Sequence, residues 1–242
     1  GVGVALADKL ETLVGMFGIG NLPTGDKDPF ALRRHALGVI RMLVEKDLAL
    51  DLNTLVAAAL PAFGDKISDA SVALCDFVYD RLAGSLREQG FSALEVDAVL
   101  ALRPQRLGDV SRRLVAVRAF TALAEAPALA AANKRISNIL KKADAAAAAD
   151  AHVSELLLKE DAERALYAAM QDIAPRAQAQ LDAGDYAAAL QTLAALRQPV
   201  DAFFEGVMVN AEALDLRLNR LGLLKTLHSA MNQVADLSRL AA

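Results

Sequence analysis

The 242-residue sequence has little of what usually carries catalysis: it contains one cysteine, three histidines and no tryptophan. The single Cys75 excludes a disulfide within the chain and is compatible with a reducing compartment, where we expect it to be a small core residue. His35, His152 and His228 lie in separate segments, and neither an HxxxH nor a CxxC motif occurs. We therefore predict no metal site and no catalytic nucleophile in this chain.

Long hydrophobic runs are also missing. No apolar stretch reaches the roughly 18 to 20 residues that a membrane-spanning helix needs, and no signal peptide opens the chain. We expect a soluble, cytoplasmic protein without a membrane partner. The first residue is glycine rather than methionine, and residues 4–17 already follow a helical pattern, so we also expect a fragment of a longer chain.

What is abundant favours helix. Hydrophobic residues make up 55% of the chain, alanine and leucine dominate, and runs of β-branched residues are scarce. The sequence predicts an all-α fold made of helical bundle domains. The Ala-rich run 144–151 is either a continuation of a helix or an exposed elbow. Helices are predicted over residues 4–17, from 29 onward, 53–63, 68–89, 92–103, 111–123, 127–142, 154–181, 185–197, from 199 onward, and 211–240.

Several residues mark helix ends. Asp28 followed by Pro29 is typical of a helix start, because the Asp side chain accepts from first-turn amides and proline needs no donor there. Gly90 is placed to end the helix over residues 68–89. Ser92 and Glu95 have the spacing of a capping box. These signals predict where the elements begin and end.

One stretch, residues 128–142, separates two unlike faces when it is drawn as a helix. Its apolar positions recur at helical spacing and predict a buried stripe. A basic and amide-bearing edge lies on the far side. The apolar stripe consists of Leu129, Ala132, Ile136, Ile139 and Leu140, and the polar edge consists of Lys134, Asn138 and Lys141 with Arg135 and Lys142 beside them.

Basic clusters stand out because the chain as a whole is acidic, with a formal net charge of −4. Lysine and arginine neutralise phosphates, and asparagine can read unpaired base edges, so the clusters favour an RNA surface. For any single cation, a merely solvated helix face remains the alternative. The predicted RNA contacts are Asn133, Lys134, Arg135, Asn138, Lys141, Lys142, Asn210, Arg217, Asn219, Arg220 and Lys225.

Arg33 and Arg34 lie at a predicted helix start, where cations oppose the helix dipole. A specific partner should therefore compensate them. One alternative is an intramolecular carboxylate. The other is contact with the body of a tRNA or with a partner subunit.

The residues also carry a resemblance. The run LADKLETLVGMFGIG, the loop PTGDKDP and the helix start FALRR form one continuous match of about 45 residues to the beta subunit of the bacterial, heterotetrameric glycyl-tRNA synthetase. Later segments resemble the same family: SALEVDAVLALRP, NKRISNILKK, PVDAFFEGVMV and LRLNRLGLL. The last third is similar to the helical (DALR) anticodon-binding domain shared with arginyl-type synthetases.

The resemblance implies a division into residues 1–104, the end of an HD-like helical region with its extension, and 105–242, an anticodon-binding domain. It implies tRNA(Gly) and the alpha subunit as partners, with a second beta subunit possible and no DNA. In that family the alpha subunit aminoacylates and the whole enzyme uses ATP and magnesium, so this fragment is expected to hold no cofactor and to be non-catalytic. The alternative is a helical protein-interaction scaffold without RNA contact, which the negative net charge favours.

Overall fold

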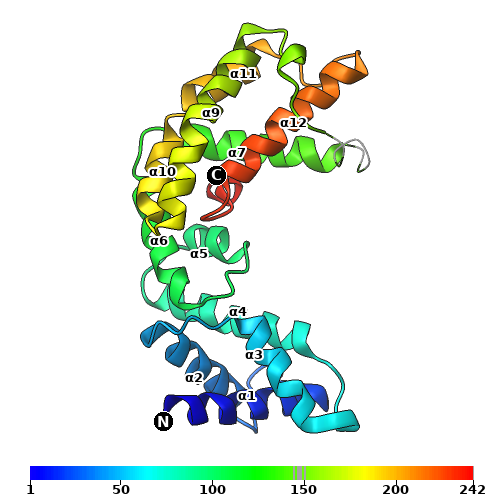
Figure 1. Cartoon of the computed structure of the whole chain (residues 1–242). Helices are drawn as coiled ribbons and strands as arrows, with labels where there is room; N and C mark the ends of the chain where they lie inside the picture. The colour runs from blue at the N-terminus through cyan, green and yellow to red at the C-terminus, as the bar shows by residue number, and fades with distance from the viewer. Residues whose placement is uncertain (144, 146–148, 150, 242) are drawn as a thin grey trace. The chain divides into compact units, whose positions relative to one another are not determined.

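The computed structural model describes residues 1–143, 145, 149 and 151–241 (Figure 1). Every regular element within these residues is a helix, which confirms the all-α prediction, and an isolated β-bridge joins Thr24 to Lys27. The chain divides into two compact units, Gly1–Arg112 and Arg113–Ala242. This division concerns packing alone, and the functional boundary between residues 104 and 105 stays a prediction.

The N-terminal unit packs its helices around leucines at the predicted spacing. Leu6, Leu10 and Leu13 of the first helix are buried, and so is Leu43 of the second. The elements are α1 (Val2–Gly18), α2 (Leu32–Glu45), α3 (Leu52–Ala59), the 3₁₀ helix η1 (Leu60–Lys66), α4 (Ser71–Glu88) and α5 (Ala93–Leu100). Because the apolar residues of α1 recur every three or four positions, one side of the helix meets its neighbours and the other stays exposed.

The predicted start of α2 is wrong, although the predicted cap is present. The helix begins at Leu32 rather than at Pro29, because Ala31 adopts a left-handed conformation with φ of 53°. The Asp28 carboxylate nevertheless accepts hydrogen bonds from the amides of Leu32 and Arg33, at 2.8 and 3.0 Å. Asp28 thus caps the first turn across a bend in the chain that the residue pattern does not reveal.

The other predicted helix ends of this unit are confirmed. Gly90 follows α4 with φ of 95°, a conformation that glycine adopts without strain. The Ser92 hydroxyl accepts from the Glu95 amide while the Glu95 carboxylate accepts from the Ser92 amide, which completes the predicted capping box. Cys75 is buried, as expected of a small core residue.

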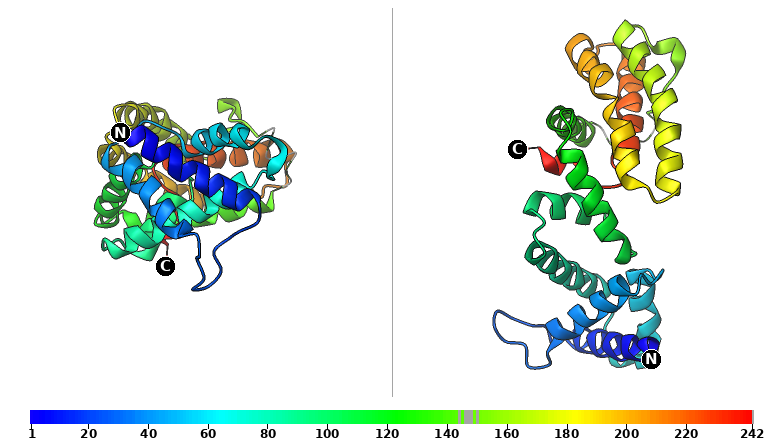
Figure 2. Two further views of the ribbon diagram at one scale, coloured as in Figure 1. Left: turned by 90° about the horizontal axis from the view of Figure 1, so that it is seen from below. Right: turned by 90° about the vertical axis from the view of Figure 1, so that its left-hand side faces the viewer.

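The C-terminal unit is built mainly from α7 and four later helices. An antiparallel pair, α9 and α10, turns at Gly184, and the Asp185 carboxylate accepts from the Ala188 amide at 3.1 Å (Figure 2). Both predicted helices, 154–181 and 185–197, are present, but the first begins at residue 161 rather than 154. The boundary between the units falls within α6 (Gly108–Thr121), whose residues from Arg113 onward belong to this unit. The elements that follow are α7 (Ala126–Lys142), the 3₁₀ helix η2 (Glu155–Leu157), α9 (Asp161–Asp182), α10 (Tyr186–Ala194), α11 (Arg197–Gly206), α12 (Leu214–Met231) and the 3₁₀ helix η3 (Leu237–Leu240).

The last helix is shorter than predicted. It ends at Met231, after which the Asn232 side chain accepts from the Leu237 amide at 2.8 Å and folds the chain into η3. Asparagine competes with helix by bonding nearby backbone, which explains the early end. The Ala-rich run 144–151 lies for the most part outside the described residues. Of the helices that are described, none alone is long and apolar enough to cross a membrane; α6 and α7, a bent pair, reach that length and composition only together.

Candidate nucleic-acid interface

A pocket of about 870 Å³ lies in the C-terminal unit between α7, the start of α12 and the segment that follows α11. It gathers six of the eleven predicted RNA contacts: Lys134, Arg135, Asn138, Lys142, Asn210 and Arg217. The other described lining residues are Ala131, Ile139, Ala143, Leu214, Leu221 and Ala241. Four cations and two amides thus face one space whose described lining includes no carboxylate.

The structure confirms the burial predicted for Leu129, Ala132 and Ile136 of α7. The other two residues of the predicted stripe, Ile139 and Leu140, are only half-buried, and Ile139 lines the pocket. Leu129 and Ile136 have no exposed surface, whereas Lys134 and Asn138 are exposed one turn apart. The helix is fixed by its apolar side, so its basic edge points into the pocket. This geometry follows directly from the 3.6-residue period.

Several side chains of the pocket have hydrogen-bond donors without a partner among the described residues. Among the described residues, the side chains of Lys134, Asn138, Lys142 and Asn210 form no hydrogen bond or ion pair. Elsewhere in the same unit, arginines are paired with an aspartate one turn away. Such pairs are Arg164 with Asp161, Arg176 with Asp172, Arg197 with Asp201, and Arg239 with Asp236. Within the part of the chain that the structure describes, the pocket therefore offers an anion positive charge that no carboxylate pairs with.

Two of the predicted RNA-contact residues, Arg217 and Arg135, are held at the pocket by contacts that the sequence did not indicate. Arg217 lines it while donating to the carbonyl oxygen of Ala211 at 3.3 Å, which ties the segment containing Asn210 to α12. The guanidinium of Arg135 lies over the ring of Phe204, with its carbon 4.2 Å from the ring centroid. Phe204 itself is only half-buried.

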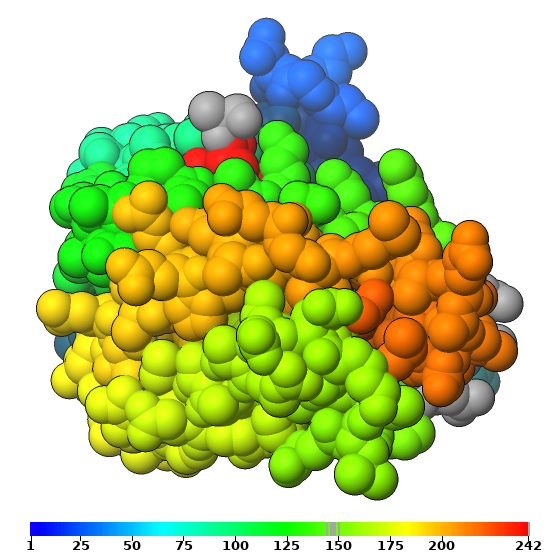
Figure 3. All heavy atoms as spheres, turned by 90° about the horizontal axis from the view of Figure 1, so that it is seen from above, coloured from blue at the N-terminus to red at the C-terminus, as the bar shows by residue number. Residues whose placement is uncertain are grey.

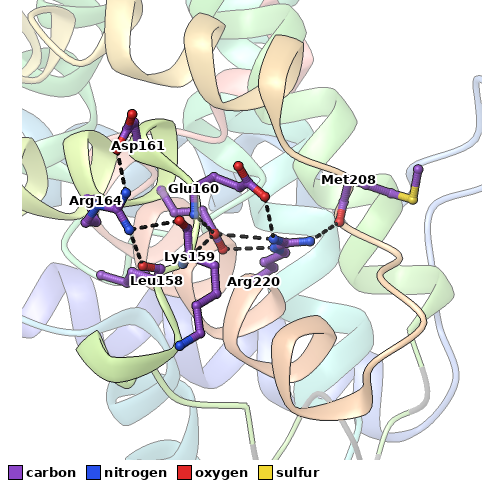
Figure 4. Close-up of polar contacts among 8 residues, drawn as sticks. Leu158, Lys159, Glu160, Asp161, Arg164, Met208 and Arg220 are labelled. Carbon is purple, nitrogen blue, oxygen red and sulfur yellow. Dashed lines mark hydrogen bonds and ion pairs between the residues drawn. The ribbon is translucent and has the colours of Figure 1, made fainter.

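Arg220 does not fit its predicted role. Its side chain is 6% exposed and forms an ion pair with the fully buried Glu163, with Nε 2.9 Å from Oε1. Nη1 of Arg220 donates to the Met208 carbonyl at 2.7 Å, and Nη2 lies 4.0 Å from Oε1 of Glu160 (Figure 4). Arg220 thus holds the start of α9 and the segment after α11 against α12. Its burial leaves it no surface for direct contact with RNA.

The segments that Arg220 joins lie next to each other on one face of this unit. In the view from above, the beginning of α9, in yellow-green, and the segment after α11, in orange, are neighbours on the surface (Figure 3). Burial alone would raise the pKa of Glu163, but hydrogen bonds from Arg220 and from the Glu160 and Lys159 amides outweigh it and hold the pKa below its usual value. Glu163 is therefore ionised inside the fold.

Two predicted asparagines are likewise buried. Asn133 is fully buried, donates to the Leu129 carbonyl at 2.9 Å and accepts from the Asn232 side chain at 2.8 Å. Asn219 is 2% exposed, and its oxygen accepts from the Ser154 amide at 2.6 Å. Both side chains tie separate segments together, so the predicted contact of these two with base edges is not available in this structure.

Four further predicted residues lie outside the pocket. Lys141 and Lys225 are exposed, and Lys141 lies on the side of α7 that approaches His228. In the N-terminal unit, Arg33 donates to the carbonyl of Gly25, so its intramolecular partner is a carbonyl rather than a carboxylate. Arg34 is exposed. The loop before α2, which contains Gly25, extends away from the helices of its unit (Figure 2).

His228 supplies a pH prediction for the packing behind the pocket. Burial lowers its pKa below 6.5, outweighing Asp236, which raises it, while Lys141 lowers it further; its Nε2 lies 3.0 Å from the Ser137 hydroxyl. Since the unfolded chain binds this proton more readily, the free energy of unfolding should fall as the pH drops below about 6.5. Urea titrations at several pH values, compared with His228→Gln, would measure this. An equal decline in both proteins would mean that His228 is not responsible.

Comparison with known proteins assigns both parts of the chain. Residues 1–101 match the family model described as glycyl-tRNA synthetase beta subunit, and residues 129–238 match the DALR anticodon binding domain. The second match contains every described lining residue of the pocket except Ala241.

Relatives cover the whole chain. It is 78% identical to the glycine–tRNA ligase beta subunit of Polaromonas naphthalenivorans and 76% identical to that of Delftia acidovorans, over 242 residues in each case. The beta subunit of Dechloromonas aromatica is 64% identical over 244 aligned positions. In each comparison all of this chain is aligned, and it spans about a third, 34%, of the relative.

Proposed function

Because this chain belongs to the glycyl-tRNA synthetase beta subunit family and carries a DALR anticodon binding domain, we propose that its C-terminal unit binds the anticodon loop of tRNA(Gly) in the pocket between α7 and α12. The observation that carries the proposal is the meeting of Lys134, Arg135, Lys142 and Arg217 in one space without a carboxylate in its described lining. The cations neutralise phosphates, while Asn138 and Asn210 offer amides to unpaired base edges.

The dimensions and character of the pocket support this ligand. Its volume of about 870 Å³ is at the upper end of what small-molecule sites usually have, and suits more than one nucleotide. Apolar side chains, Leu214 and Leu221 among them, alternate with the charged ones and can lie against base faces. A loop with unstacked bases provides both the charge and the flat apolar surfaces that such a lining binds.

The proposed role is positioning rather than chemistry. Gripping the anticodon end places the acceptor end at the catalytic site, which removes part of the entropic barrier without supplying a reacting group. In this proposal the alpha subunit attaches glycine, ATP and magnesium act there, and a second beta subunit completes the cytoplasmic enzyme. Residues 105–242 form the anticodon-binding domain, and residues 1–104 the preceding helical region, where Arg33 and Arg34 contact the tRNA body or the alpha subunit.

A protein-interaction scaffold is the competing function, and salt separates the two. RNA binding through about four phosphates predicts a slope near −3 in a plot of log affinity against log salt. Docking by apolar surface predicts a nearly flat plot. The test is binding of this chain to tRNA(Gly), and to the same tRNA with a changed anticodon, at several salt concentrations.

Replacing Lys134 and Arg135 together with alanine should weaken tRNA(Gly) binding at least tenfold at low salt and reduce the salt slope by about 1.4, because two phosphate contacts are lost. The helix content should not change, since both side chains are exposed. Replacing Lys159 and Arg176, exposed cations of the same unit outside the pocket, with alanine removes equal charge and is the control. Equal weakening by both double variants would show that general charge, not this pocket, binds the RNA.

A further inference from the structure

Three side chains contact one another in a row that ends at the pocket: Phe203, Phe204 and Arg135. Phe203 is fully buried, and its ring meets that of Phe204 edge-on, with centroids 5.4 Å apart and an interplanar angle of 79°. The guanidinium of Arg135 then lies over Phe204 at 4.2 Å. Since Phe203 is locked in the core, it fixes Phe204, and Phe204 in turn fixes the position of an otherwise long and flexible side chain.

Arg135 lines the pocket, whereas Phe204 does not. The ring therefore supports one face of the guanidinium, and the rest of the group is left to the pocket. Among the described residues Arg135 forms no hydrogen bond or ion pair. Arg113 of the same unit also lies over an aromatic ring, that of Tyr186, but it donates hydrogen bonds to the carbonyl oxygens of Gln233 and Val234. Arg135 is thus held in place with its donors unused.

We propose that Arg135, supported by Phe204, is the platform on which one unpaired base of the bound RNA stacks, and that Phe204 is a positioning residue for it. A guanidinium is planar, delocalised and weakly hydrated, so it stacks on a base face better than a lysine ammonium does. Lys134 lies beside it for the phosphate, and Asn138 lies within the same lining for a base edge. This inference rests on the function proposed above and adds that the flat face of the Arg135 guanidinium recognises a base, while its charge still neutralises a phosphate.

The test compares Arg135→Lys and Phe204→Leu with the unaltered chain, using the anticodon stem-loop of tRNA(Gly) and versions of it with an abasic site at each loop position in turn. Both variants keep the net charge. We expect each to bind the intact stem-loop about 5- to 160-fold more weakly, the range typical of one stacked base, with an unchanged salt slope. Removing the base at one loop position should weaken binding by the unaltered chain by the same factor. It should leave the affinity of either variant almost unchanged. Phe204→Tyr, which keeps the ring, should bind like the unaltered chain.

The outcomes separate this inference from the proposed function. Two results would overturn the stacking platform while leaving the RNA site in place. One is equal affinity of the two variants and the unaltered chain for the intact stem-loop. The other is that, at every abasic position, the loss of affinity from the variant and the loss from the abasic site add independently. A salt slope that changes in Phe204→Leu would also overturn it, since no charge has been altered. Failure of the unaltered chain to bind the stem-loop would overturn the proposed function itself. Circular dichroism of each variant checks that the fold is retained.

Discussion

Replacing Arg220 with methionine should destabilise the C-terminal unit by about 3–5 kcal/mol, because it leaves the Glu163 carboxylate buried without its cation. The Met208 carbonyl also loses its donor, which frees the segment that carries Asn210 into the pocket. For a unit of this size the loss corresponds to a fall in Tm on the order of 15 °C. Thermal and urea unfolding followed by circular dichroism would measure it.

Two comparisons show whether the buried charge is the cause. Adding Glu163→Gln to the Arg220→Met variant should restore part of the stability, since glutamine is neutral and still accepts from the Glu160 and Lys159 amides. Arg176→Met, which breaks the exposed pair with Asp172, should cost no more than about 1 kcal/mol. Equal losses from Arg176→Met and Arg220→Met would show that burial of the pair contributes nothing.

The pH dependence gives a further check on the same pair. In the unaltered chain the lowered pKa of Glu163 stabilises the fold at neutral pH, and this contribution is lost as the pH falls below about 4.5. Without Arg220 the buried carboxyl prefers its protonated form, so stability rises as the pH falls. The difference in stability between the two proteins should therefore shrink in acid, and a constant difference would contradict the assignment.

Replacing Ile136 with aspartate should unfold the C-terminal unit. Ile136 is fully buried on the inner face of α7, so the substitution removes packing that is typically worth about 2–5 kcal/mol and adds a charge without a partner. The sum reaches the whole stability of an ordinary domain, about 5–15 kcal/mol. Loss of helical circular dichroism and of the urea transition of this unit would be the measurement.

Asn138→Asp is the matched control for this variant, because it places the same new charge on the exposed face of the same helix. We expect it to stay folded within about 0.5 kcal/mol of the unaltered chain. A folded Ile136→Asp variant together with an unfolded Asn138→Asp variant would mean that the two faces of α7 are assigned the wrong way round.

Much of the site could be predicted from the order of residues. The apolar spacing of Leu129 and Ile136 fixes which side of α7 is buried, and therefore which side presents Lys134 and Asn138. The same reasoning failed for Arg220, which is three residues after Arg217 on α12. A helix turns by about 100° per residue, so a spacing of three leaves a difference of some 60° in direction, and only the neighbouring helix decides whether such a side chain is covered.

The sequence alone determined what depends on neighbours along the chain. The helices, the capping box of Ser92 and Glu95, the Asp185 cap and the two faces of α7 belong to this class, because their interactions span one or two turns. The tertiary structure alone decided the meeting of Asn210 with Lys134, the support of Arg135 by Phe204 and the burial of Arg220 against Glu163. These contacts join distant segments, and their existence depends on how whole helices pack rather than on any local pattern.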